Sequence, residues 1–150
     1  MKMKFVAFTV LTLVLAGSAH AVDTAVTADT AGKPDLAAAR SKIEAKDFPA
    51  AIALLTPMTT QYQDPDVFNL LGFSYRKSGD LKQAATFYGK ALDFDPNFKP
   101  AIEYQGELFL QMNDLDKAKA NLTKLAKLCA AGCEEKDDLE KAIAAYTPTN

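Results

Sequence analysis

Apolar residues recur every three or four positions between residues 35 and 146, which is the spacing of one buried face of an α-helix. Short polar turns interrupt this pattern. Gly79 and Asn113 each precede an aspartate that can cap a following helix, and Asp64 caps a helix that begins with Pro65. The pattern therefore predicts an all-α chain made of short helices joined by tight turns.

One unit of this pattern, at residues 68–96, is more regular than the rest. Its characteristic residues are Phe68, Leu71, Gly72, Tyr75, Ala84, Tyr88, Ala91 and Pro96. Gly72 recurs as Gly106, a shift of 34 positions, and Asp80 corresponds to Asp47, a shift of 33 positions. A period of this length indicates a stack of similar helix pairs.

The two flanking units depart from the middle one at particular positions. In the third unit Gln105 replaces a leucine, and Asn113 stands in place of Gly79. Because asparagine tolerates the left-handed conformation better than most residues, we expect this turn to be kept. The first helix of the first unit, roughly residues 35–45, is degenerate and carries Lys42 at an aromatic position. A terminal repeat faces solvent on one side, so such a departure is expected.

These residues and turns resemble the tetratricopeptide repeat, a helix–turn–helix unit of about 34 residues. The resemblance covers residues 35–128 and implies an all-α solenoid of about three repeats. A further amphipathic segment, Asp137–Tyr146, is expected to cap the last repeat, which gives a repeat domain over residues 35–146 with a capping helix from about residue 136. Residues 128–146 also resemble the tail of small exported proteobacterial proteins of this family, a similarity that implies no particular activity.

The first 21 residues have the composition of a secretory signal. Lys2 and Lys4 precede an apolar run at residues 5–16, and residues 19–21 form a small-x-small cleavage site. The run is too short to span a bilayer of about 30 Å permanently, and a short membrane anchor is the alternative interpretation. Residues 22–34 lack a helical period and are expected to form a flexible leader. We expect an exported protein, periplasmic or otherwise secreted, with no membrane insertion after signal removal.

Removal of this signal would limit the chemistry of the chain. The single histidine is His20, so the mature chain would have no imidazole for a catalytic relay or a metal site. Removing Lys2 and Lys4 from 17 basic residues leaves 15 against 19 acidic ones, which gives no electrostatic case for nucleic acid. The acidic pairs at 134–135 and 137–138 are expected to be solvated at the start of a helix. We expect neither an enzyme nor a bound cofactor or metal.

The family resemblance implies a binding groove, because its first helices line a concave surface. The residues that map to this surface are Asn69, Phe73, Arg76, Lys77, Glu103, Glu107, Leu110, Gln111 and Arg40. Phe73 lies beside the packing stripe, so it is either an exposed aromatic anchor or an ordinary core residue. A subtype of the family grips a carboxylate with Lys, Asn and Arg, and the presence of Asn69 and Phe73 at the relevant positions excludes that clamp.

Cys129 and Cys133 are the only cysteines. In an exported chain they are expected to form a disulfide that staples the last repeat to the capping helix, with Gly132 breaking the helix between them. Three alternatives stay open. The pair could be redox-active, could bind copper or zinc with Met58 or Met112, or could remain free or pair with another chain.

Three functions follow as hypotheses. The first is a periplasmic interaction module, an adaptor or scaffold, that binds a peptide or a subunit of an envelope complex in the groove. The alternative is a thiol–disulfide or metal-handling protein that uses Cys129 and Cys133. The third is a self-associating structural protein, because an exposed repeat end can stack on itself. The sequence does not identify a partner.

Overall fold

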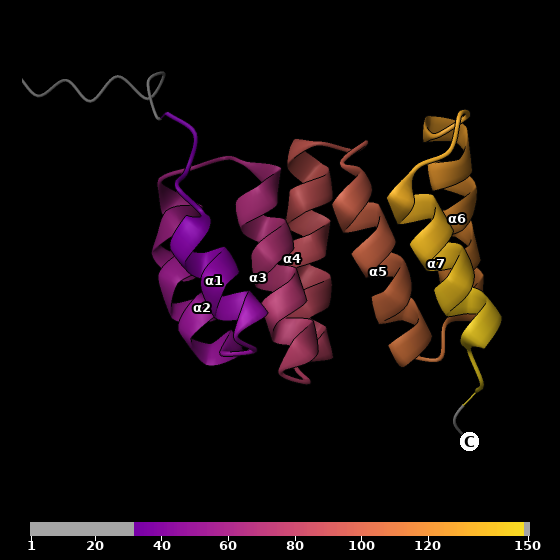
Figure 1. The fold of residues 1–150 in the computed structure, drawn as a ribbon, viewed down its shortest axis with the longest axis horizontal. Coiled ribbons are helices and arrows are strands. Elements are labelled where there is room, and N and C mark those ends of the chain that lie inside the picture. The colour runs from indigo at the N-terminus through magenta and orange to yellow at the C-terminus, as the bar shows by residue number, and fades with distance from the viewer. Residues whose placement is uncertain (1–31, 149–150) are drawn as a thin grey trace, which may run out of the picture.

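The computed structural model describes residues 32–148 (Figure 1). Within them it has seven α-helices, one 3₁₀-helix and no strand. In chain order the elements are α1 (Ala37–Glu44), α2 (Phe48–Leu55), the 3₁₀-helix η1 (Thr56–Thr60), α3 (Pro65–Lys77), α4 (Leu81–Phe94), α5 (Lys99–Gln111), α6 (Leu115–Leu128) and α7 (Glu134–Ala145). This confirms the predicted all-α class. The expected signal and most of the expected leader lie outside the described residues.

The turns inside the helix pairs follow one design. The aspartates before α2, α4 and α6 each accept a hydrogen bond from the backbone N–H three residues later; they are Asp47 (3.3 Å), Asp80 (3.0 Å) and Asp114 (3.1 Å). The residue before each aspartate is in the left-handed region; these residues are Lys46 (φ 59°), Gly79 (φ 89°) and Asn113 (φ 58°). The expected equivalence of the Gly79 and Asn113 turns is therefore confirmed.

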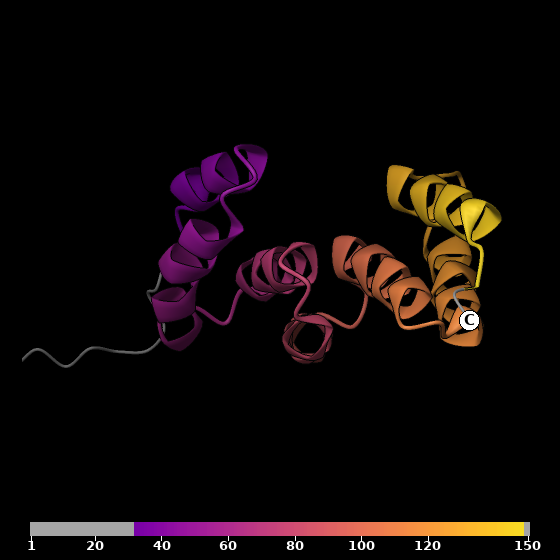
Figure 2. The same cartoon turned by 90° about the horizontal axis from the view of Figure 1, so that it is seen from below.

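The helices pack as successive pairs, α1 with α2, α3 with α4, and α5 with α6. Helix α7 packs against both α5 and α6, as the first helix of a further pair would. In the view of Figure 2, α1 and α7 rise on either side of α3 and α5, and α4 lies on the opposite side. The array is therefore curved, and its concave side is formed mainly by the first helix of each pair and by α7.

Small residues allow two of the helix contacts to be close. A Cβ atom at Gly72 in α3 would lie 2.6 Å from Cδ1 of Tyr88 in α4. A Cβ atom at Gly106 in α5 would lie equally close, 2.6 Å, to Cδ2 of Leu139 in α7. Tyr88 and Leu139 are both fully buried. Gly72 thus allows α3 and α4 to pack closely, and Gly106 does the same for α5 and the capping helix α7.

Two helix boundaries have local causes in the sequence, and one of them differs from the expected position. Helix α2 ends at Leu55, because Pro57 cannot donate a backbone hydrogen bond and its ring obstructs the preceding turn, and the chain continues as η1. Helix α7 begins at Glu134 rather than near residue 136. Glu134 and Glu135 stand in its first turn, where negative charge is favourable.

The polar residue Gln105 in α5 is accommodated by a hydrogen bond between helices. Asn121 in α6 donates from Nδ2 to the Gln105 side-chain oxygen at 3.2 Å and to the Ile102 carbonyl at 2.9 Å. The glutamine that replaces leucine at this position thus has a hydrogen-bond partner in Asn121. Over residues 32–148, no helix combines the length and the apolar character needed to cross a membrane.

Candidate functional site

Two hollows on the concave side of the array, both formed by residues 32–148, contain predicted groove residues. The first, which we call the central pocket, has a volume of about 480 Å³ and lies between α3, α5 and the C-terminal part of α7. The second, which we call the acidic pocket, has a volume of about 220 Å³ and lies between the N-terminal parts of α5 and α7. Both involve residues that the sequence assigned to the groove.

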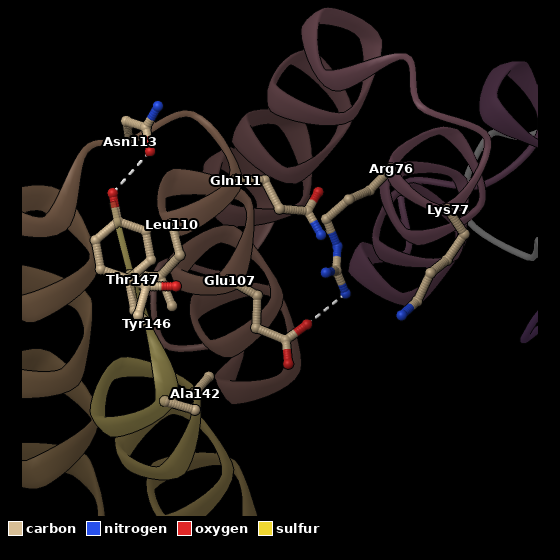
Figure 3. A pocket seen from close by; sticks show the side chains of 10 residues that line it. Arg76, Lys77, Glu107, Leu110, Gln111, Asn113, Ala142, Tyr146 and Thr147 are labelled. Atoms are coloured by element: carbon tan, nitrogen blue, oxygen red, sulfur yellow. Dashed lines mark hydrogen bonds and ion pairs between the residues drawn. The ribbon is translucent and has the colours of Figure 1, made fainter. Parts of the chain in front are cut away.

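The central pocket brings together five of the nine predicted groove residues. Its lining consists of Arg76, Lys77, Glu107, Leu110, Gln111, Asn113, Ala142, Ala145, Tyr146 and Thr147. Figure 3 shows Arg76 and Glu107 reaching toward each other from neighbouring helices, with Ala142 and Tyr146 contributed from the side of α7. The Tyr146 hydroxyl donates a hydrogen bond to Oδ1 of Asn113 at 2.8 Å, which fixes the end of α7 beside the turn before α6.

Arg76 forms part of the pocket wall and is not a free cation. Its side chain is 2% exposed, its Nη2 lies 2.5 Å from Oε2 of Glu107, and its Nε donates to the Tyr88 hydroxyl at 3.3 Å. Nη2 has no aligned hydrogen-bond acceptor, so the contact with Glu107 is a close ion pair. The guanidinium also lies over the rings of Phe73 and Tyr104, 5.5 and 5.7 Å from their centroids. Arg76 therefore holds the side chains of the pocket wall in place. A partner would contact the residues around Arg76 rather than its guanidinium group.

Phe73 is half-buried, so it is neither the fully exposed aromatic anchor nor the ordinary core residue that the sequence left open. Its ring centroid lies 6.4 Å from that of Phe48 and 5.1 Å from that of Tyr104. The ammonium group of Lys77, an exposed residue, lies 5.3 Å from the same centroid. Phe73 is thus held by aromatic neighbours while part of its ring stays accessible on the concave side.

The acidic pocket contains a buried carboxyl group without a partner. Glu103 is 8% exposed, lines the pocket, and forms no hydrogen bond or ion pair with any residue in the range 32–148. Burial raises the pKa of Glu103 to about 8. The negative charges of Glu107, Asp138 and Glu135 act in the same direction. The positive charge of Arg76 opposes them and is the weakest of these influences.

The remaining predicted residues have separate roles. Asn69 is 2% exposed, and its Oδ1 has no hydrogen-bond partner within the described part of the chain. Arg40 is exposed and forms an ion pair with Asp66 that links α1 to α3. Neither residue lines the two pockets described above. Leu110 is 8% exposed and provides apolar wall, whereas Gln111 is exposed at the rim of the central pocket.

Helix α7 supplies pocket residues that the sequence reasoning assigned only to a cap. Ala142 and Ala145 line the central pocket, and Glu134, Glu135 and Asp138 line the acidic pocket. The expectation of purely solvated acidic pairs therefore missed their proximity to Glu103. The available signal was the group of alanines on both sides of Ile143, because small residues beside a packing stripe leave open space.

Cys129 and Cys133 are joined in the structure by a disulfide, with Cα atoms 5.6 Å apart. The bridge connects the end of α6 to the residue that precedes α7. The ligand-capable atoms of Cys129, Cys133 and Glu135 lie within 4.8 Å of one another. Because bonded sulfurs offer no thiolate, this group could bind a metal ion only after reduction.

A family model and a curated relative match parts of the chain. Residues 65–98 match the model of the tetratricopeptide repeat, and this segment contains the unit that the sequence marks as most regular. The chain is 32% identical over 63 residues to the uncharacterized protein ycf37 of Pyropia yezoensis. The matched segment covers 42% of this chain and only 35% of that relative.

Solved structures share the fold over most of the chain. The structures of PcrH in complex with the chaperone-binding regions of PopD and of PopB each have a TM-score of 0.63 and 23% identity. The matches cover 72% of this chain and 82% and 88% of those chains. The translocator chaperone SycD of Yersinia enterocolitica has a TM-score of 0.63 and 18% identity, covering 71% of this chain and 81% of its own. The chain thus contains a tetratricopeptide repeat at residues 65–98 within a helical-repeat fold like that of these chaperones.

Proposed function

We propose that this protein is a non-catalytic interaction module that binds an extended segment of another protein along its concave surface. The observation that carries the proposal is the central pocket. Its walls come from three helices and combine the apolar side chains of Leu110, Ala142 and Ala145 with the polar groups of Lys77 and Gln111. An apolar surface with a few polar groups at its rim is suited to the side chains of a bound peptide.

The fixed arrangement of side chains in the wall of the central pocket supports the same function. The ion pair of Arg76 with Glu107 and the hydrogen bond of Arg76 to Tyr88 hold the pocket in shape without a ligand. A preformed surface loses less conformational entropy on binding than one that must be ordered. The structures of similar fold include PcrH bound to the chaperone-binding regions of two other proteins, which supports a peptide ligand here.

The proposed place of action is the periplasm, or more generally the space outside the cytoplasmic membrane. This proposal rests on the signal-like composition of residues 1–21 and on the cysteine pair, which oxidising compartments keep bonded. Expression of the full-length sequence in a Gram-negative host tests it. Mass spectrometry of the periplasmic fraction should find a chain that begins at Val22, whereas an unprocessed cytoplasmic chain would contradict export.

A pair of substitutions at neighbouring alanines tests the binding surface. Ala144 and Ala145 are both exposed in the last turn of α7, but only Ala145 lines the central pocket. An arginine at either position has the same helix propensity and the same charge, so the two variants differ only in where the side chain points. We therefore compare Ala145→Arg, which fills the pocket, with Ala144→Arg as its matched control.

The measurement begins with a random peptide library selected against the purified protein. Fluorescence anisotropy then gives the affinity of the enriched peptides for both variants. Ala145→Arg should weaken binding at least about tenfold, equivalent to about 1.4 kcal/mol, while Ala144→Arg should bind like the parent. Equal binding by the two variants would show that the pocket is not the peptide site, and a library without binders would overturn the function itself.

A further inference from the structure

We propose that the acidic pocket receives one cationic side chain, a lysine or an arginine, of the bound segment. This inference rests on the proposed function and names a chemical preference of the same surface. It starts from Glu103, a buried carboxyl group that lines a cavity and has no hydrogen bond or ion pair in the described range. The carboxyl oxygens of Glu103 open onto the cavity, where a bound side chain can reach them.

The surroundings of Glu103 define the partner it lacks. Glu134, Glu135 and Asp138 face the same cavity from α7, and among residues 32–148 no basic residue lines it. The three carboxylates of α7 repel an anion and attract a cation, and Glu103 adds a fourth negative charge when it ionises. Arg76 is the basic residue that influences Glu103, but it is already held by Glu107 and Tyr88. Residues 32–148 supply no free basic group to this cavity, and we assign the positive charge to the bound segment.

The size and the walls of the cavity favour a single side chain. Its volume of about 220 Å³ is below the range of about 300–1,000 Å³ that is usual for drug-sized ligands. Pro100 and the ring of Tyr104 form its non-acidic walls. The methylene groups of lysine or arginine can pack on such walls while the charged end reaches the carboxylates.

The protonation of Glu103 gives this binding a measurable signature. Because its pKa lies at about 8, Glu103 is largely protonated at neutral pH in the free protein. Glu107 on the same helix and Asp138 and Glu135 on α7 keep the proton on, and Arg76 on α3 favours its release. A cation in the cavity would reverse this balance, so binding should release a proton and strengthen as the pH rises.

The first test uses small probes and needs no peptide. N-acetyl-lysine methylamide is titrated into isotope-labelled protein while the carboxyl ¹³C resonance of Glu103 is followed by NMR, and N-acetyl-norleucine methylamide is the uncharged control. The lysine probe should shift this resonance toward the ionised form, and the norleucine probe should not. Equal responses, or no response to the lysine probe at saturating concentration, would overturn the proposal.

The second test uses a peptide that the library selection yields. Replacing its lysine or arginine by norleucine should weaken binding to the parent about tenfold. The same replacement should have no effect on Glu103→Gln, whereas Glu140→Gln, at an exposed acidic residue outside the cavity lining, should respond like the parent. If the norleucine peptide binds the parent equally well, the cation preference is wrong although peptide binding stands. Displacement of the peptide by Ca²⁺ or Mg²⁺ at low concentration would instead assign the cavity to a metal ion.

Discussion

At the residue scale, two buried charged residues, Arg76 and Glu103, distinguish the concave surface from an ordinary apolar core. Arg76 is buried but satisfied by Glu107, by Tyr88 and by two aromatic rings. Glu103 is buried somewhat less deeply and has none of these compensations within the described residues. Because burial disfavours the ionised carboxyl group, ionised Glu103 lowers the stability of the free protein.

The pH dependence of stability should reveal this cost. The folded pKa of Glu103 is about 8 and its ordinary value is 4.5, so the folded state holds the proton more tightly. The contribution of Glu103 to the free energy of unfolding is therefore fully present below about pH 4.5, and it is lost as the pH rises toward 8. From pH 5 to pH 8 the parent should therefore lose about 1–2 kcal/mol relative to Glu103→Gln, after allowance for solvent screening.

Thermal or urea unfolding of the parent and of Glu103→Gln across this pH range checks the prediction. Glu140→Gln serves as the control, because Glu140 is exposed and its pairing with Lys136 lies on the surface. Parallel pH profiles for the parent and Glu103→Gln would mean that Glu103 keeps an ordinary pKa in the folded protein.

Two glycines allow a direct test of the close packing between helices. Gly72→Ala would place a methyl group against the buried Tyr88 ring and should destabilise the protein by about 1–3 kcal/mol. Gly89→Ala meets no atom within 4 Å and should stabilise it by about 0.5–1 kcal/mol through helix propensity. Urea unfolding midpoints measure both, and equal effects of the two changes would contradict the proposed role of Gly72.

The residues that could be predicted from sequence are those with a local or periodic signature. The packing role of Gly72 and the left-handed turn at Asn113 follow from spacing and from backbone chemistry alone. The burial of Arg76 and Glu103 does not, because it depends on which helices approach them from other units. The helical repeat in the sequence predicts which face of a helix a residue occupies, but it does not predict how deeply helices from other units bury that residue.

At the scale of elements, the capping helix α7 is held by packing and by the disulfide. Leu139 packs with Ile102 and Leu125, and the Cys129–Cys133 bridge closes the short connection from α6. The sequence predicted this helix from the amphipathic pattern of residues 137–146. It did not predict that α7 supplies two pocket walls, because that depends on the angle at which α7 leaves the last repeat.

Removing the disulfide should loosen α7 in particular. In the chain-entropy estimate, a loop this short stabilises the folded state by roughly 2 kcal/mol, so the double variant Cys129→Ser, Cys133→Ser should lose about that amount. Hydrogen exchange should rise first in α7, while the amides of α3 and α4 stay protected. The reduced parent should behave like the variant. Unchanged stability in both would show that the bridge is not a staple.

At the scale of the whole molecule, the concave surface depends on both ends of the array. Helix α1 is tied to α3 by the Arg40–Asp66 ion pair, and α7 closes the other end over α5 and α6. The period in the sequence predicts that pairs stack, but not how far each turns relative to the last. Because that turn decides which side chains from different units meet, the pockets could be located only in the structure.

Truncation of the C-terminal end should expose the repeat core and cause self-association. A chain that stops at Leu128 lacks Leu139 and Ile143, so Ile102 and the adjoining apolar surface of α6 lose their cover. An uncovered repeat end presents the surface that normally receives another helix, so a second copy can take its place. Light scattering after size-exclusion chromatography should show concentration-dependent dimers or larger species.

A chain that stops at Tyr146 is the matched control, since it keeps α7 and its hydrogen bond to Asn113 and should behave like the parent. If the shorter chain stays monomeric with α5 and α6 still protected from hydrogen exchange, the last repeat does not need its cap. Partial unfolding of α5 and α6 without association would keep the capping role and exclude stacking. The comparison therefore separates a helix that only stabilises the array from one that also prevents a second copy from stacking on its end.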